Sequence, residues 1–258
     1  MKKSNILILI FIIVLTNISA NAQYKNLNVK LGKYTFSTKF DSSSYLTTFK
    51  IKKGKNTIYY KTTEIPITGI TEYDLNNDGN NEILIDMYSG GAHCCTYLVA
   101  AVIKENKFKI LDTIYWGNSF YTIEDLNKDG RKEIFGASDI FAYAFTNFAQ
   151  SEDPILIYGF ENNKFKNVTK NFPDIVKKDI EAHLKKLIPY TTDTGFACPI
   201  TDTFNTDAGT VKAILAPIVA DYYTLGEVKR GYDLVDSVYK CPDKDKFIQT
   251  LQSEYKLK

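Results

Sequence analysis

The segment DLNNDGNNEI at residues 74–83 recurs 51 residues later as DLNKDGRKEI at residues 125–134. Seven positions are identical in the two copies: aspartate, leucine, asparagine, aspartate, glycine, glutamate and isoleucine. Oxygen-bearing side chains at positions 1, 3 and 5 of a tight loop can converge on one hard cation, and glycine at position 6 permits the sharp turn. Calcium fits this spacing better than magnesium, which demands stricter octahedral geometry and keeps more of its water. The repeat therefore predicts two calcium sites.

Each predicted site has four side-chain ligands and one backbone carbonyl. The ligands of the first loop are Asp74, Asn76, Asp78, Glu82 and the carbonyl of Asn80. Those of the second loop are Asp125, Asn127, Asp129, Glu133 and the carbonyl of Arg131. Asp, Asn and Gly also form ordinary turns. Two copies that match at seven positions favour metal binding over that explanation.

The sequence around the loops indicates strands and not helices. An EF-hand needs an acid at position 12 and a helix on each side, whereas position 12 is Ile85 in one copy and Gly136 in the other. Dockerins carry similar paired segments, but their loops also lead into helices and use the position-12 acid. The extended pattern of residues 70–73 and 83–85 places the first loop in a β-hairpin.

A nine-position acidic loop that closes a β-hairpin resembles the FG-GAP and VCBS repeats, the calcium loops of integrin-type β-propeller blades. The resemblance covers residues 69–165 and implies the same loop ligands. The chain differs from the family in three ways. It has only two clear loops, its last ligand is glutamate where the family usually has aspartate, and it lacks the Phe-Gly and Gly-Ala-Pro signatures. A seven-bladed propeller needs more chain per blade. We therefore expect a few blade-like hairpins in a partial propeller or sandwich.

The predicted fold class is α+β, with a change of pattern near residue 171. Short apolar runs separated by polar turns predict antiparallel strands from residue 23 to about 171. After Pro173 the apolar period indicates four helices, around residues 176–187, 211–222, 228–239 and 247–255. Pro217 should kink or split the second helix, and the short Leu225-Gly226 junction favours an antiparallel helical hairpin. We divide the chain into a β-rich domain, 23–171, and a helical segment, 172–258.

The first residues are typical of a signal peptide. Lys2 and Lys3 precede an apolar run from Ile6 to Leu15, and small residues at 20–22 offer a cleavage site. The run is shorter than the roughly 20 residues of a bilayer span, so we predict a secreted or periplasmic protein with no membrane span after cleavage. Loss of residues 1–22 takes the formal charge from +2 to zero, which gives no electrostatic footprint for nucleic acid.

Four cysteines in an exported chain favour disulfides. Cys198 precedes the second predicted helix and Cys241 follows the third, so the hairpin favours this pair. If that pair forms, Cys94 and Cys95 must pair with each other. The alternative is that Cys94 and Cys95 each form a disulfide with one of the two cysteines of the helical region. The segment Gly90-Gly91-Ala92-His93-Cys94-Cys95 also resembles segments of uncharacterised exported proteins with this type of loop.

His93 suggests two further hypotheses, a metal site with the cysteines or a hydrolase with an acid such as Asp86. No fourth metal ligand with recognisable spacing appears. The nucleophile-elbow, zinc-protease and phosphate-loop motifs are absent from the sequence. We therefore expect a non-enzymatic protein, and a periplasmic inhibitor or immunity-type protein is a further alternative.

The favoured function is a calcium-binding module that binds or scaffolds an unidentified protein or glycan. Its recognition surface is expected near the loops and the 90–95 turn. Six aromatic residues could contribute to that surface or pack in the core: Tyr88, Tyr115, Trp116, Tyr121, Phe141 and Tyr143.

Overall fold

The computed structural model describes residues 25–91, 94–192, 195–200 and 202–258. Its first part consists of three antiparallel sheets, each with four strands paired in chain order. The first sheet contains β1 (Asn28–Leu31), β2 (Tyr34–Asp41), β3 (Leu46–Lys53) and β4 (Asn56–Thr63). The second contains β5 (Ile67–Tyr73), β6 (Glu82–Tyr88), β7 (Thr96–Lys104) and β8 (Lys107–Gly117). The third contains β9 (Tyr121–Glu124), β10 (Glu133–Ala137), β11 (Ile155–Glu161) and β12 (Lys164–Asn167).

Side-chain alternation and tight turns explain the strands. In β3, Thr47, Phe49 and Ile51 are buried, whereas the residues between them are partly exposed. Ile51 pairs with Phe36 across to β2, so one face of the first sheet is apolar. Glu105 and Asn106 join β7 to β8 with φ of 52° and 62°, the conformation of a two-residue hairpin turn whose twist suits the adjoining strands.

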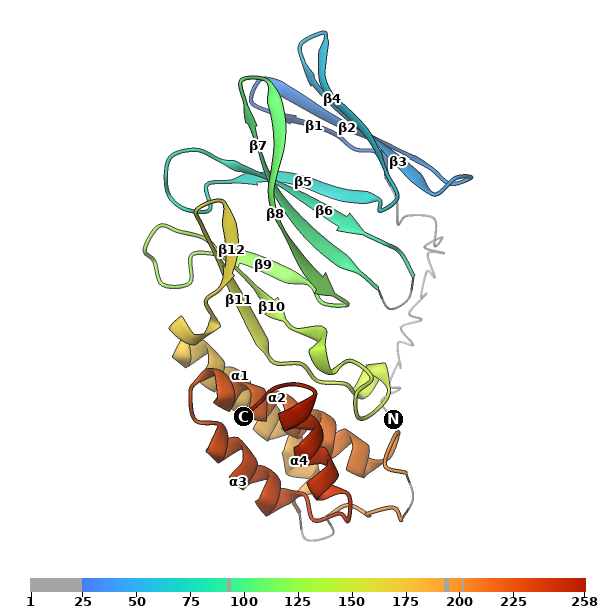
Figure 1. Ribbon diagram of the computed structural model, residues 1–258, viewed down its shortest axis with the longest axis vertical. Helices are drawn as coiled ribbons and strands as arrows, with labels where there is room; N and C mark the ends of the chain where they lie inside the picture. Colours follow the sequence, from blue (N-terminus) through green and yellow to red (C-terminus); the bar gives the residue numbers. More distant parts are fainter. Residues whose placement is uncertain (1–24, 92–93, 193–194, 201) are drawn as a thin grey trace, which may run out of the picture.

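The sheets are stacked along the long axis of the molecule, with the helices at the far end (Figure 1). One core lies between the first and second sheets and includes Phe36, Phe49, Ile70 and Ile85. A second core lies between the second and third sheets and includes Leu84, Trp116, Ile134 and Phe160. The second sheet is therefore covered on both faces, in agreement with its four consecutive buried residues in β6.

The four predicted helices are confirmed. They are α1 (Pro173–Leu187), α2 (Asp207–Thr224), α3 (Val228–Val238) and α4 (Lys244–Ser253). Short 3-10 turns occur at η2 (Asp139–Phe141), η3 (Phe148–Gln150), η4 (Thr169–Asn171) and η5 (Ile188–Tyr190). Helix α2 continues through Pro217, so the helix is not split there, and the alternative of a kink at Pro217 stays a prediction. Among the described residues, no helix is both long enough and apolar enough to span a membrane.

Helix α2 is the centre of the helical core. Its residues 208–221 are all buried, as expected for a helix that is apolar on every side. Phe141 and Phe145, from the segment between β10 and β11, pack in the same core. The α+β class and the order of its parts are confirmed, while the boundary near residue 171 as a limit between independent domains stays a prediction.

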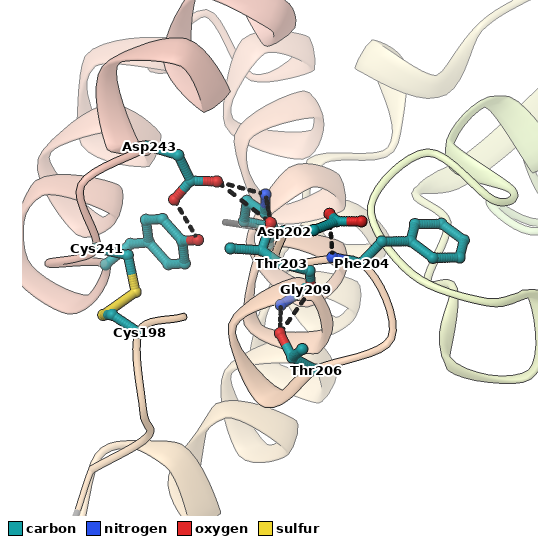
Figure 2. A network of polar contacts seen from close by, with 10 residues as sticks. Cys198, Asp202, Thr203, Phe204, Thr206, Gly209, Cys241 and Asp243 are labelled. Atoms are coloured by element: carbon teal, nitrogen blue, oxygen red, sulfur yellow. Dashed lines mark hydrogen bonds and ion pairs between the residues drawn. A yellow bond between two sulfur atoms is a disulfide. The ribbon is translucent and has the colours of Figure 1, made fainter. Parts of the chain in front are cut away.

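A disulfide and a polar network hold the segment before α2 against the end of α3 (Figure 2). Cys198 and Cys241 are bonded, with Cα atoms 5.2 Å apart, which is the pairing favoured by the helical hairpin. Asp243 accepts hydrogen bonds from Lys212 Nζ and Tyr239 Oη, both at 2.8 Å. Burial acts to raise the pKa of Asp243, but these donors outweigh it and leave the pKa lowered. Because the charged groups are mutually paired, we interpret this network as structural.

Candidate functional site

The two acidic loops have the same hydrogen-bond pattern. In the first loop, which joins β5 to β6, Asp78 N–H donates to Asp74 Oδ1 at 3.0 Å and to Asn76 Oδ1 at 3.1 Å. In the second loop, which joins β9 to β10, Asp129 N–H donates to Asp125 Oδ1 and Asn127 Oδ1, both at 3.1 Å. The side-chain oxygens at positions 1 and 3 therefore converge in both copies.

Backbone conformation accounts for the glycine at position 6. Gly79 and Gly130 have φ of 83° and 91°, in a region that residues with a Cβ rarely adopt. Their N–H groups donate to Asp74 Oδ2 at 2.8 Å and to Asp125 Oδ2 at 2.9 Å. These hydrogen bonds hold the carboxylate at position 1 of each loop against the glycine turn at position 6.

A buried glutamate closes each loop. Glu82 accepts a hydrogen bond from Leu75 N–H at 3.1 Å, and Glu133 accepts one from Leu126 N–H at 2.9 Å. Burial raises the pKa of Glu82, and the charges of Asp78 and Asp74 add to the rise. Glu133 shows the same raised pKa, for the same reasons, beside Asp129 and Asp125.

This donor set fits calcium. Each loop brings three carboxylates and one side-chain amide oxygen close to one another, and the carboxylates repel. A hard cation with oxygen ligands would relieve that repulsion. The ligand roles of the eight side chains, and those of the Asn80 and Arg131 carbonyls, stay predictions.

The two loops are in direct contact. Lys132 N–H donates to the carbonyl oxygen of Leu75 at 2.9 Å, and a Cβ at Gly130 would collide with the side-chain amide of Asn77. Both loops project from the same side of the stacked sheets (Figure 1). A side chain at position 130 would therefore displace the Asn77 amide, in addition to the strain that its positive φ would cause.

A cavity of about 520 Å³ lies at the other end of the same hairpins. We call it the Asp86 pocket; its lining residues are Thr68, Asp86, Tyr88, Thr96, Phe120 and Tyr121. Thr68 lies near the start of β5 and Tyr121 begins β9, so both hairpins run from the pocket to an acidic loop. Phe120 is 84% exposed at its rim.

Asp86 and Tyr121 form the polar centre of the pocket. Tyr121 Oη donates a hydrogen bond to Asp86 Oδ1. Burial raises the pKa of Asp86, and this hydrogen bond offsets part of the rise. Burial also raises the pKa of Tyr121, and the charge of Asp86 adds to it. Tyr121 stacks on Trp116 with ring centroids 5.6 Å apart, which fixes its orientation.

The turn that begins with Gly90 and Gly91 borders this pocket. Tyr88 Oη donates to the carbonyl oxygen of Gly91 at 2.6 Å, and Cys95 N–H donates to Ser89 Oγ at 2.7 Å. Cys94 and Cys95 are paired with one another, so neither is a free thiol. Tyr115 Oη lies 3.2 Å from Cys95 Sγ. His93, singled out by the sequence, lies outside the described residues.

The expectation of one recognition surface near both the loops and the 90–95 turn stays a prediction, and the structure shows how far such a surface must extend. The first loop ends where β6 begins, at Glu82, and the turn follows its end at Tyr88. Seven residues of strand separate the two features by about 20 Å. A ligand that contacts both features must therefore span about 20 Å, whereas a smaller ligand at the turn contacts the Asp86 pocket alone.

The six aromatic candidates divide between surface and core. Trp116 and Phe141 are fully buried in two different cores. Tyr88 and Tyr121 line the pocket. Tyr115 is exposed beside Cys95 in the neighbouring turn, and Tyr143 is exposed in the segment between β10 and β11. Sequence reasoning missed Phe120 and the two threonines of the pocket, because an isolated aromatic or threonine carries no motif.

A third group, between α1 and α2, was also missed. Asp179, His183 and Asp221 place potential ligand atoms within 4.8 Å of one another. Burial raises the pKa of Asp221 to about 10, and the charge of Asp179 adds to the rise. Two signals were available in the sequence: the spacing of Asp179 and His183, which puts both on one helix face, and an acid inside an otherwise apolar helix.

Comparison with known proteins gives one distant similarity. A probable thylakoid lumen protein of Synechocystis sp. (strain PCC 6803) is 27% identical over an alignment of 136 residues that covers 45% of this chain and 40% of that protein. The match thus spans less than half of the relative's length. No protein-family model matches the chain, and no solved structure matches it.

Proposed function

We propose that this chain is an exported calcium-binding module that binds a glycan in the Asp86 pocket. The observation that carries the proposal is the shared geometry of the two acidic loops, which adopt one hydrogen-bond pattern and contact each other through Lys132 and Leu75. Two calcium ions there would fix the far ends of the hairpins that line the pocket. Calcium is assigned a structural role, which couples its binding to folding.

The arrangement of the sheets supports a relationship to FG-GAP and VCBS repeats. Each sheet is a four-stranded antiparallel meander, the form of a propeller blade. In the second and third sheets the acidic loop joins the first two strands. We therefore propose that these sheets are blade-like units in a stacked array of three.

The chemistry of the pocket supports a glycan more than another small ligand. Sugar rings pack their C–H faces on aromatic side chains, and Tyr88, Phe120 and Tyr121 supply such faces. Asp86, Thr68 and Thr96 supply groups that hydrogen-bond to sugar hydroxyls. A binding role is favoured over glycoside hydrolysis because hydrolysis normally uses two carboxyl groups, and Asp86 is the only acid among the described lining residues.

Three observations support export. The pattern of residues 1–22 is typical of a signal peptide, and the distant relative bears the name of a lumen protein. Disulfide pairing of Cys198 with Cys241 also fits an oxidising compartment. We accordingly propose a secreted or periplasmic location.

Calorimetric titration and a glycan array together test the proposal. We expect two calcium ions per chain, and binding of a glycan class that Phe120→Ala abolishes. Tyr60→Ala is the matched control, because Tyr60 is exposed on β4, away from the pocket. Absence of heat on addition of calcium would contradict the loop assignment. Glycan binding that Phe120→Ala leaves intact, or no glycan binding at all, would contradict the pocket assignment.

A further inference from the structure

Asp221 is a buried acid that faces a second carboxyl group, that of Asp179. Its side chain lies near the end of α2, and the residue is 1% exposed. Neither of its carboxylate oxygens accepts a hydrogen bond from a described residue. A buried carboxylate without partners is strongly unfavourable, and buried charges are normally paired or coordinate a metal. The position therefore calls for either a cation or a proton that Asp221 shares with Asp179.

Helix α1 places two potential ligands beside Asp221. Asp179 and His183 are four residues apart and share one face of α1. His183 Nδ1 lies 3.6 Å from Asp179 Oδ2. These atoms and a carboxylate oxygen of Asp221 fall within 4.8 Å of one another. One imidazole and two carboxylates thus converge from two helices.

His183 Nδ1 lies 3.0 Å from the backbone carbonyl oxygen of Asp179, so in the metal-free chain this nitrogen carries a proton that a metal ion would have to displace. Its other ring nitrogen, Nε2, lies 3.5 Å from Glu152 Oε2. Metal-ligating histidines usually donate this second N–H to a carboxylate, which fixes the ring and strengthens its basicity. Glu152 is held in turn by Lys186 Nζ at 2.5 Å. Asp179 Oδ2 accepts a hydrogen bond from Ile155 N–H at 3.1 Å, which ties the same group to β11.

We propose that Asp179, His183 and Asp221 bind one divalent transition-metal ion, with zinc the best match, at the junction of α1, α2 and the third sheet. Imidazole nitrogen with carboxylate oxygen suits zinc, whereas calcium and magnesium favour oxygen ligands alone. Three protein ligands leave a fourth position of the tetrahedron for water. The ion would neutralise Asp221 and cross-link the two helices. This site is independent of the calcium loops.

The competing explanation is a proton shared between Asp179 and Asp221, which would need no metal. Metal analysis of the purified, chelator-treated protein after it is reloaded with zinc separates the two. We expect about one zinc ion per chain, with binding lost in Asp221→Asn and His183→Gln. Glu152→Gln, which acts on the position of His183, should weaken zinc binding by about 10-fold to 100-fold. Circular dichroism of each variant establishes that it is folded.

The chain offers a matched control, because it contains only two histidines. His93→Gln should retain zinc, whereas His183→Gln should not. Asp129→Ala, which removes a loop carboxylate, should also retain it. Wild-type protein that takes up no zinc would overturn the proposal and favour the shared proton. Zinc that depends on His93 or on Asp129 instead of His183 would overturn it as well.

Discussion

The backbone N–H of Lys132 donates to the carbonyl oxygen of Leu75 at 2.9 Å, so the two acidic loops form one contiguous structure. Each loop begins where one hairpin strand ends, and the opposite ends of those hairpins line the Asp86 pocket. Disorder in either loop would therefore affect both the neighbouring loop and the pocket. If the Asp86 pocket binds a ligand as proposed, a variant that disorders either loop should also weaken that binding.

Asp78→Ala and Asp129→Ala should each lower the melting temperature in calcium by on the order of 5 °C. The loss in chelator should be clearly smaller, because there each variant lacks only the turn hydrogen bonds, such as those from Asn80 N–H and Arg131 N–H. The reason is that only the calcium-bound state uses these carboxylates as ligands. Thermal unfolding followed by circular dichroism in both conditions measures the effect. Asp41→Ala is the control, because Asp41 accepts hydrogen bonds from Ser43 and Ser44 in an ordinary turn. Asp41→Ala should lower the melting temperature by the same amount with and without calcium. Equal losses for Asp78→Ala would count against ligation.

Asp86→Asn should raise stability at neutral pH but not near pH 4. Burial raises the folded-state pKa of Asp86 above its unfolded value, so between the two pKa values the folded protein holds more protons than the unfolded one. Its free energy of unfolding therefore falls as pH rises through that window. The asparagine variant lacks this loss and can still accept the hydrogen bond from Tyr121. Denaturant unfolding at a series of pH values measures the difference, and a gain that is constant with pH would contradict this account.

Local chemistry made the loops and helices predictable, whereas packing determined the rest. The repeated Asp, Asn and Gly positions specify a turn and its donors within ten residues, and apolar period specifies α1 to α4. The pocket instead combines residues from four strands and the segment before β9. The group around Asp221 combines two helices. Phe120 and Asp221 acquire their roles from neighbours distant in the sequence, and no local pattern encodes that proximity. The stacking of the three sheets is likewise a tertiary property.

Gly231→Ala should destabilise the protein by about 1–3 kcal/mol through overpacking. A Cβ at Gly231 on α3 would lie 2.9 Å from Val219 Cα on α2, so the helices must separate to accept it. The gain in helix propensity from alanine, up to about 1 kcal/mol, acts in the opposite direction. Ser237→Ala on the exposed side of α3 is the control and should change stability little. Urea unfolding distinguishes the two outcomes, and a stabilised Gly231→Ala variant would show that the helices are less closely packed.

The two cysteine pairs should differ sharply in their contribution to stability. The bond between Cys198 and Cys241 closes a separation of 43 residues, and the loss of unfolded-state entropy from such a loop corresponds to about 4 kcal/mol. Cys94 and Cys95 are adjacent in sequence, so their bond restricts the unfolded chain very little. We therefore expect replacement of Cys198 and Cys241 by serine to lower the free energy of unfolding by most of this amount. Replacement of Cys94 and Cys95 by serine should lower it little. Chemical denaturation of both variants measures the difference directly. A large loss from the adjacent pair would show that the turn beside the Asp86 pocket stabilises the folded state through its native contacts, because chain entropy cannot supply that loss.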